Sequence, residues 1–324
     1  MKRGVRTLWA VGWLWASATI ALGQSMADKH VERGNEFAMR RNYARAKVEY
    51  QKAVRADPKH LDALYNLAVV CMELGEWKEA VEAHHRYLAI KPHDADVWTQ
   101  LGVVHERLGD REAARAAYRK ALELQPDFAR AHHNLGVLLK EEGDMDSAGR
   151  HLRRALELEE SSGRRTAGVY YSMGVYCLAR GQAREAKQML QRALEQEPHS
   201  PIFLNAMGDA YLMEKDAKVA LVYFRRALEK DANYALAYSG MGDAHRQLGD
   251  IEEAARNYRR ALQLQPNFHV IHFKLGELYQ ESQPAEAIKH FEKYLASARN
   301  PAFARQANER LAVLRALVEL HKGK

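Results

Sequence analysis

The chain has 324 residues, of which 47% are hydrophobic and 28% are charged. This composition supplies enough apolar side chains for a core and enough charge for helices that each expose one polar face. The net charge is +7, and because residues 1–23 hold three basic side chains and no acidic one, the rest of the chain carries only +4. Lysine and arginine are spread along the chain instead of clustering with aromatic residues, which argues against nucleic-acid binding.

Residues 1–23 have the pattern of a secretory signal peptide. Basic side chains precede an apolar segment, residues 8–22, and the small residues Ala21 and Gly23 mark a cleavage site before Gln24. The apolar segment has about 15 residues, whereas a membrane-spanning helix needs roughly 20. We therefore expect an exported protein, periplasmic or secreted. The alternative is a protein that an uncleaved segment 8–22 anchors in the membrane.

A 34-residue unit, clearest at residues 95–128, predicts two helices joined by a turn. Its first half places residues of one helix face at i, i+3, i+4 and i+7, namely Trp98, Leu101, Gly102 and His105. A break at Gly109 follows, and the second half has a similar stripe, Ala114, Tyr118 and Ala121, which ends before Pro126. Large and small residues alternate on both stripes, so we expect the two helices to pack closely where their small residues meet.

The same unit recurs along nearly all of the remaining chain. When repeat positions are counted from Ala27, with an offset of four after the fourth repeat, position 20 is always alanine: Ala46, Ala80, Ala114, Ala148, Ala186, Ala220, Ala254 and, after a one-residue deletion, Ala287. Position 8 is glycine or alanine: Gly34, Ala68, Gly102, Gly136, Gly174, Gly208, Gly242 and Gly276. We therefore predict eight helix-turn-helix repeats, in which the first helix (helix A) and the second (helix B) alternate.

The repeats divide into residues 27–162 and residues 167–299, and an insertion at 163–166 separates the two groups. After the last repeat, residues 301–320 predict a helix that caps the array with the stripe Phe303, Ala307, Leu311, Leu314 and Leu317. The two cysteines, Cys71 and Cys177, both occupy position 11 of a helix A, three repeats apart. We expect two buried free thiols and no disulfide.

This pattern resembles the tetratricopeptide repeat (TPR) family, which has a small residue at position 8, alanine at positions 20 and 27, aromatic residues at 11 and 24, and proline at 32. The resemblance covers residues 27 to about 299 and implies an all-α, right-handed superhelical solenoid. It also implies a protein-binding module in which the A helices line a concave groove that receives an extended peptide or a partner helix.

In this family the groove is lined chiefly from positions 2, 5, 6, 9 and 12 of helix A. The resemblance therefore assigns a peptide-binding role to Tyr65, Asn66, Thr99, Gln100, His133, Asn134, Tyr171, Asn205, Asp209, Asp243 and Glu277. The clamp for a chaperone carboxylate would need cationic side chains where Val31 and Asp96 stand, so that ligand is not expected. Asn66, Gln100 and Asn134 are similar to part of the asparagine ladder that holds a peptide backbone in O-GlcNAc transferases.

Position 9 changes in character along the chain. It is valine in repeats two to five, at Val69, Val103, Val137 and Val175, and acidic in repeats six to eight, at Asp209, Asp243 and Glu277. If position 9 faces the groove, the partner should carry an apolar stretch and a stretch rich in Lys or Arg, the latter over repeats six to eight.

No nucleotide-binding, nucleophile-elbow or zinc-protease motif is present in the sequence. Most histidines stand at packing positions of the repeat, and His269 with His272 has no third metal ligand placed nearby, so we expect no catalytic residue, metal or cofactor. The sequence predicts a non-enzymatic scaffold for protein or peptide partners, acting in cell-envelope assembly. The alternative is a subunit that presents substrates to an envelope enzyme complex, such as a glycosyltransferase or export machinery.

Overall fold

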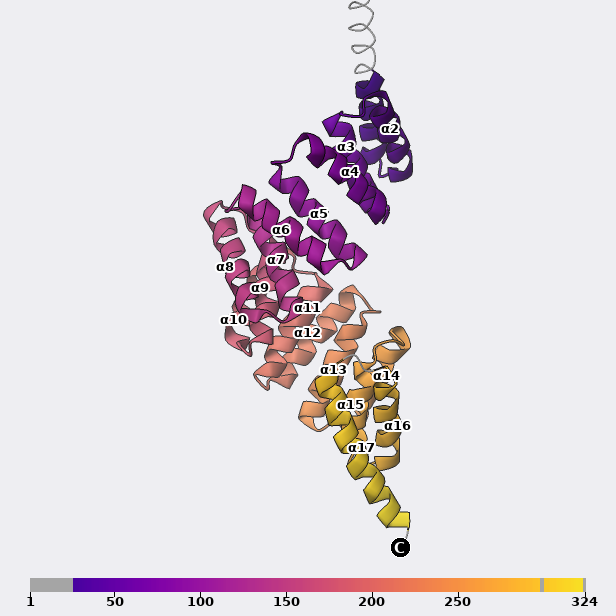
Figure 1. Ribbon diagram of the computed structural model, residues 1–324. Helices are drawn as coiled ribbons and strands as arrows, with labels where there is room; N and C mark the ends of the chain where they lie inside the picture. The colour runs from indigo at the N-terminus through magenta and orange to yellow at the C-terminus, as the bar shows by residue number, and fades with distance from the viewer. Residues whose placement is uncertain (1–25, 298–299, 323–324) are drawn as a thin grey trace, which may run out of the picture. The chain divides into compact units, whose positions relative to one another are not determined.

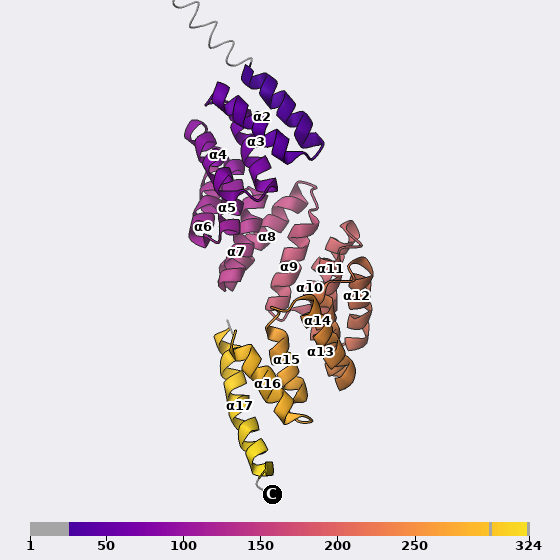
Figure 2. The same cartoon turned by 90° about the vertical axis from the view of Figure 1, so that its right-hand side faces the viewer.

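The computed structural model describes residues 26–297 and 300–322, and the predicted signal peptide lies outside them. All regular structure in these ranges is helical, and successive helices form antiparallel hairpins (Figures 1 and 2). The A helices are residues 26–39, α3 (Leu61–Glu73), α5 (Ala95–Leu108), α7 (Ala129–Glu142), α9 (Ala167–Ala179), α11 (Pro201–Met213), α13 (Ala235–Leu248) and α15 (Val270–Tyr279). The B helices are α2 (Tyr43–Ala56), α4 (Trp77–Ile90), α6 (Arg111–Leu124), α8 (Met145–Ser161), α10 (Ala183–Gln196), α12 (Ala217–Lys230), α14 (Ile251–Leu264) and α16 (Pro284–Leu295). The all-α class and the repeated hairpins are thereby confirmed.

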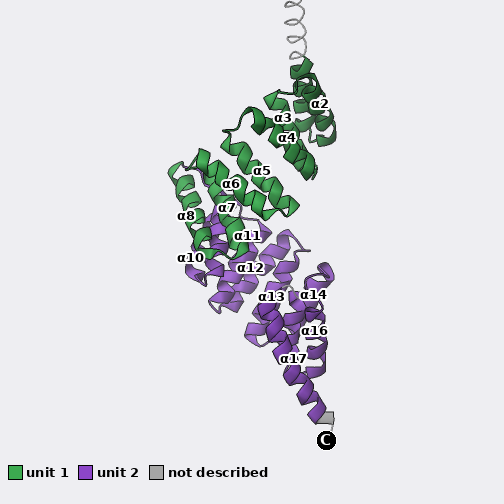
Figure 3. Cartoon of the chain, in the orientation of Figure 1, with its two compact units in different colours: residues 1–162 green, residues 163–324 purple. Residues whose placement is uncertain are grey.

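The chain divides into two compact units, residues 1–162 and 163–324 (Figure 3). The boundary falls at the start of the insertion predicted at residues 163–166. The first unit contains the hairpins up to α8. The second contains α9 to α16 and ends with α17 (Pro301–Lys322).

The turn inside seven of the eight hairpins depends on one residue with a left-handed backbone; the exception is the turn that leads into α16. At repeat position 15 this residue is glycine in five repeats, with φ between 74° and 89°: Gly75, Gly109, Gly143, Gly181 and Gly249. Arg41 and Lys215 occupy the same position in repeats one and six, with φ of 55° and 65°. Side chains with a Cβ atom rarely adopt this conformation. These two turns are therefore strained, while the glycine turns are not.

Inside each hairpin, the small residue at position 8 packs against a large side chain at position 24. A Cβ atom added to Gly102 would lie 2.4 Å from a ring carbon of Tyr118, and six other glycines meet position 24 in the same way: Gly34, Gly136, Gly174, Gly208, Gly242 and Gly276. The sequence pattern predicted contacts between small residues, as between Gly174 and the main chain of Ala186, but not this large partner. The glycine leaves room for an aromatic ring in five repeats and for leucine in two, and these side chains bury far more apolar surface than a small one would.

Repeat two departs from this rule in both partners. Its position 8 is Ala68, which has a Cβ atom, and its position 24 is His84, whose ring is smaller than that of tyrosine. Both residues are fully buried, and neither nitrogen of His84 has a hydrogen-bond partner in the described part of the chain. Burial lowers the pKa of His84 to about 4, so this imidazole is neutral at physiological pH.

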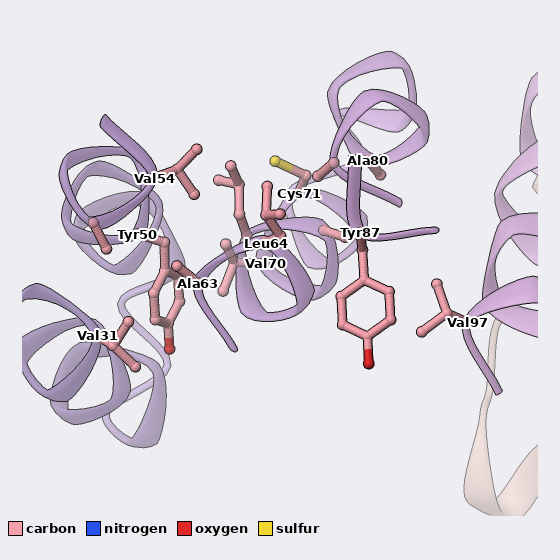
Figure 4. Packing of buried hydrophobic residues seen from close by; sticks show 14 of the residues in the cluster. Val31, Tyr50, Val54, Ala63, Leu64, Val70, Cys71, Ala80, Tyr87 and Val97 are labelled. Carbon is pink, nitrogen blue, oxygen red and sulfur yellow. The ribbon is translucent and has the colours of Figure 1, made fainter. Parts of the chain in front are cut away.

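The alanines at position 20 lie at the centre of each hairpin, and all eight are fully buried. In the first unit, the core joins neighbouring hairpins: Figure 4 shows the ring of Tyr50 between the helix that carries Val31 and the helix that carries Ala63 and Leu64. Cys71 belongs to this core, and both Cys71 and Cys177 are buried free thiols, as predicted. Burial raises the pKa of Cys71 to about 12, so its thiol is unreactive.

Consecutive hairpins are also joined by a recurring hydrogen bond that the sequence analysis did not predict. The large residue at position 4 donates to the main-chain carbonyl at position 32 of the preceding repeat. The three examples are Trp98 to Pro92 at 2.9 Å, His132 to Pro126 at 2.8 Å and Tyr238 to Ala232 at 3.4 Å. In these three repeats position 4 combines a large side chain with a donor, whereas Leu64 and Leu204 fill the same position with apolar surface alone.

The predicted capping helix is α17, which packs against α16. Ala307, Leu311 and Leu314 are buried, but the two ends of the predicted stripe, Phe303 and Leu317, are 38% and 43% exposed. None of the helices in residues 26–297 and 300–322 is long and apolar enough to span a membrane.

Candidate functional site

Position 9 of the A helices defines one half-exposed face in each unit. In the first unit it is occupied by Asn35, Val69, Val103 and Val137, and in the second by Val175, Asp209, Asp243 and Glu277; all eight side chains are of intermediate exposure. We call these the A-helix faces. They hold the residues that the family resemblance assigns to a peptide groove.

In the first unit, polar residues of the A-helix face are tied to one another across adjacent repeats. The amide of Asn66 donates to Asn35 Oδ1 at 3.1 Å, and Asn35 also accepts from the hydroxyl of Tyr50 at 2.7 Å. Asn134 in turn is hydrogen-bonded to the hydroxyl of Tyr118. The ladder amides therefore already have partners within the chain, and a peptide backbone would have to share or replace these bonds.

Gln100 belongs to a second network on the same face. Its amide donates to the hydroxyl of Tyr65 at 2.8 Å and to Asp96 Oδ2 at 2.7 Å, while Arg130 is 2.6 Å from the other oxygen of Asp96. Asp96 is thus neutralised by Arg130. His133 lies on the same face and is half-buried.

Thr99 does not belong to the surface. It is fully buried, and its hydroxyl donates to the carbonyl of Ala95 one turn earlier at 2.8 Å. The bond to its own helix satisfies the hydroxyl without solvent, which explains why a polar side chain is tolerated in the interior. The prediction that Thr99 lines a groove was therefore wrong.

The A-helix face of the second unit has an apolar area at its first A helix, α9. Tyr171 stacks on Phe203 with ring centroids 5.0 Å apart and an interplanar angle of 27°. Val175, one turn beyond Tyr171 on α9, is half-buried. Burial raises the pKa of the Tyr171 hydroxyl, so this group stays neutral.

Two of the three acidic residues at position 9 have cationic partners within the chain. Asp243 accepts from Lys274 at 2.5 Å and from the hydroxyl of Tyr258 at 2.7 Å. Glu277 accepts from Arg246 at 3.1 Å and from Arg310 of the capping helix at 2.8 Å. Arg246 lies on the same helix as Asp243 but forms its ion pair with Glu277 of the next repeat.

Asp209 is the exception among the three. Its one hydrogen bond within the described chain comes from the amide of Asn205 at 3.0 Å, and no Lys or Arg in residues 26–297 or 300–322 forms an ion pair with it. Burial raises the pKa of Asp209 to about 7; the charge of Asp243 acts in the same direction, and Lys274 opposes it. Asp209 is therefore a carboxylate that the fold leaves without a counter-ion.

A depression of about 540 Å³ opens beside Asp209, between α11 and α13. Its other lining residues are Leu212, Met213, Asp243, Arg246 and Gln247. The sequence analysis missed Leu212, Met213 and Lys274 as parts of this surface. Position 12 was a known groove position of the family and could have indicated Leu212.

Histidines form two pairs at equivalent places in the fourth and eighth repeats. His132 and His151 have Nδ1 atoms 2.8 Å apart, and those of His272 and His290 are 3.0 Å apart. His272 therefore pairs with His290 of the facing helix. In the described residues no group of three or more His, Cys, Asp or Glu side chains could hold a metal ion.

Comparison with protein-family models decides the identity of the repeats. Models described as tetratricopeptide repeat match residues 38–103, 127–196 and 171–235, and a model described as TPR repeat matches residues 107–143 and 242–283. The chain is a tetratricopeptide repeat protein. The family matches span both units, and this TPR chain is therefore built on a fold that serves as a protein–protein interaction scaffold.

Solved TPR structures share the fold at low sequence identity. A tetratricopeptide repeat protein from Parabacteroides merdae is 18% identical, with 79% of this chain and 99% of that one covered and a TM-score of 0.61. A chain of the APC/C hetero-tetramer Cut9–Hcn1 is 21% identical over 84% of this chain, with a TM-score of 0.65, and this chain spans about half (52%) of its length. The type IV pilus biogenesis factor PilW is 20% identical, with 64% and 93% covered and a TM-score of 0.57. Comparison with curated proteins finds no match for the TPR chain.

Proposed function

We propose that this TPR protein is an exported, non-enzymatic scaffold that binds a partner protein of the cell envelope through the A-helix face of its second unit. The observation that carries the proposal is Asp209, a half-buried carboxylate without a counter-ion beside an open depression. A charged group left in this state destabilises the free protein, and a partner that supplies a cation removes that cost.

The partner chemistry follows from the order of side chains along the same face. The half-buried side chains of Tyr171 and Val175 on α9 offer an apolar area backed by the buried ring of Phe203, and Asp209 lies on the next A helix, α11. Asp243 and Glu277 have their own cations, so they add little attraction for a basic ligand. The partner segment should therefore combine apolar residues with a short basic part, shorter than the Lys/Arg-rich stretch expected from the sequence.

Export is proposed from the sequence of residues 1–23 alone. The N-terminal mass of the protein purified from its native cells tests this part directly. A chain beginning near Gln24 is expected, and a chain that retains residues 8–22 would favour the anchored alternative.

The scaffold function is tested by affinity capture with the tagged full-length protein from envelope extracts after chemical cross-linking. We expect one or a few partner proteins, cross-linked to the A-helix face of the second unit, and less capture by the variant Asp209→Lys. Cross-links confined to the B helices, or equal capture by the variant, would contradict the proposed surface. Enzyme activity in the captured complex would favour the role of a substrate-presenting subunit.

A further inference from the structure

The depression beside Asp209 has the chemistry of a receptor for a positive group. Two carboxylates, Asp209 and Asp243, line it with a single cation, Arg246. Arg246 is bound to Glu277, and Lys274, the other nearby cation, is bound to Asp243. Both cations therefore form ion pairs with other carboxylates, and Asp209 lines the depression without an ion pair.

A second, independent observation comes from Asn205. This side chain is only 8% exposed, and its Oδ1 atom is buried without a hydrogen-bond partner among the described residues. Its Nδ2 atom donates to Asp209 Oδ2 at 3.0 Å. Because the amide group is planar and its nitrogen is tied to Asp209, the unsatisfied oxygen lies beside the same carboxylate. Asn205 does not line the depression, so its amide holds the carboxyl group in place while Asp209 itself lines the open space.

The walls of the depression suit a long side chain that ends in a charged group. Leu212 and Met213 supply apolar surface, and Gln247, which donates to the carbonyl of Leu212 at 3.3 Å, joins α13 to α11 at this point. Lysine and arginine bury their methylene groups against apolar surface while their heads donate three and five hydrogen bonds, respectively. A carboxylate that lines the depression without a counter-ion accepts such donors.

We propose that this depression is a subsite for a single Lys or Arg side chain of the partner protein. The methylene groups lie against Leu212 and Met213, and the charged head donates to Asp209. The subsite rests on the proposed scaffold function, because the side chain belongs to the segment bound along the A-helix face.

The test uses peptides selected on the full-length protein. A phage-displayed library of random 12-residue peptides is panned on the immobilised chain, and the most enriched peptide is synthesised with a fluorescent label. A second version carries norleucine in place of its Lys or Arg. Fluorescence anisotropy then gives the affinity of both peptides for the wild type, for Asp209→Asn and for the control Glu252→Gln, which removes an exposed carboxylate of α14 in the same unit.

Enriched peptides that share a Lys or Arg are expected. Asp209→Asn should weaken binding of the basic peptide by about tenfold and change binding of the norleucine peptide by less than about twofold. Glu252→Gln should leave both affinities unchanged. Enriched peptides without a basic residue, or equal losses for both peptides on Asp209→Asn, would overturn the subsite but leave the scaffold function standing. Failure of any peptide to be enriched, together with failure to capture a partner protein, would overturn both.

Discussion

The contact between position 8 and position 24 predicts that even a methyl group added at Gly242 destabilises the fold. In the variant Gly242→Ala the new Cβ atom would lie 2.4 Å from Cε1 and 2.5 Å from Cδ1 of Tyr258. The ring is fully buried, and its hydroxyl is held by Asp243 at 2.7 Å, so it has little freedom to move aside. Such overpacking costs about 1–3 kcal/mol, whereas alanine gains only about 0.5–1 kcal/mol over glycine inside a helix.

The matched control is Gly168→Ala. Gly168 also lies in a helix of the second unit, but a Cβ atom added there meets no atom within 4 Å. This variant should therefore keep the gain in helix propensity without a packing cost. The pair isolates the contact with Tyr258, because both substitutions add the same methyl group to a helical glycine.

Thermal unfolding of the full-length protein, followed by circular dichroism at 222 nm and by calorimetry, provides the assay. The two variants should differ by the overpacking cost of about 1–3 kcal/mol, which places the Tm of the second unit roughly 2–12 °C lower in Gly242→Ala than in Gly168→Ala, and Gly168→Ala should melt at or slightly above the wild type. The reasoning is refuted if Gly242→Ala melts together with Gly168→Ala. A Gly242→Leu variant should be less stable still, because it adds three more carbon atoms at the same place.

Three other predictions concern strain and buried charge. In chemical denaturation, Lys215→Gly should raise the free energy of unfolding by about 1 kcal/mol, because glycine adopts the left-handed turn without strain. The control Lys218→Gly, inside α12, should lower it in the same assay. Asp209, in the second unit, contributes a loss of stability of at most about 4 kcal/mol as pH rises from about 4 to 7, because the folded unit keeps a proton on this carboxyl group that the unfolded chain has released; Asp209→Asn should remove this contribution, and a pH profile identical to that of the wild type would contradict it. His84, in the first unit, contributes with the opposite sign: the unfolded chain binds the proton first, so the contribution of this group falls by about 3 kcal/mol as pH drops from 6.5 to 4, and His84→Leu should remove it from the acid-denaturation curve.

The repeats could be predicted because each depends on spacing within about 34 residues. Glycine at position 8 and alanine at position 20 identify two helices that must approach closely, and in the structure a Cβ atom added to Gly174 would lie 3.5 Å from the carbonyl oxygen of Ala186. The partner of each glycine was harder to predict. Sequence spacing says which residues share a face but not which large side chain of the facing helix fills the space.

The sequence could predict which surface carries the candidate site, but not which residues on that surface form ion pairs. Position 9 did indicate the half-exposed surface that carries Asp209, Asp243 and Glu277. Which carboxylate remains without a counter-ion depends on long cationic side chains from neighbouring helices. Lys274 comes from the next repeat and Arg310 from the capping helix, and the direction of each is set by rotamers and packing that no periodic pattern contains.

The contacts between positions 8 and 24 have a consequence for how the chain folds. Each joins residues only 15 or 16 apart in sequence, from Gly34 with Tyr50 to Gly276 with Phe291. Contacts of such short separation form quickly, because little chain entropy is lost in closing the loop between them. A hairpin can therefore close as soon as its own residues have been synthesised. Each finished hairpin then presents its apolar side as a template for the next, so the array can grow in the order of synthesis.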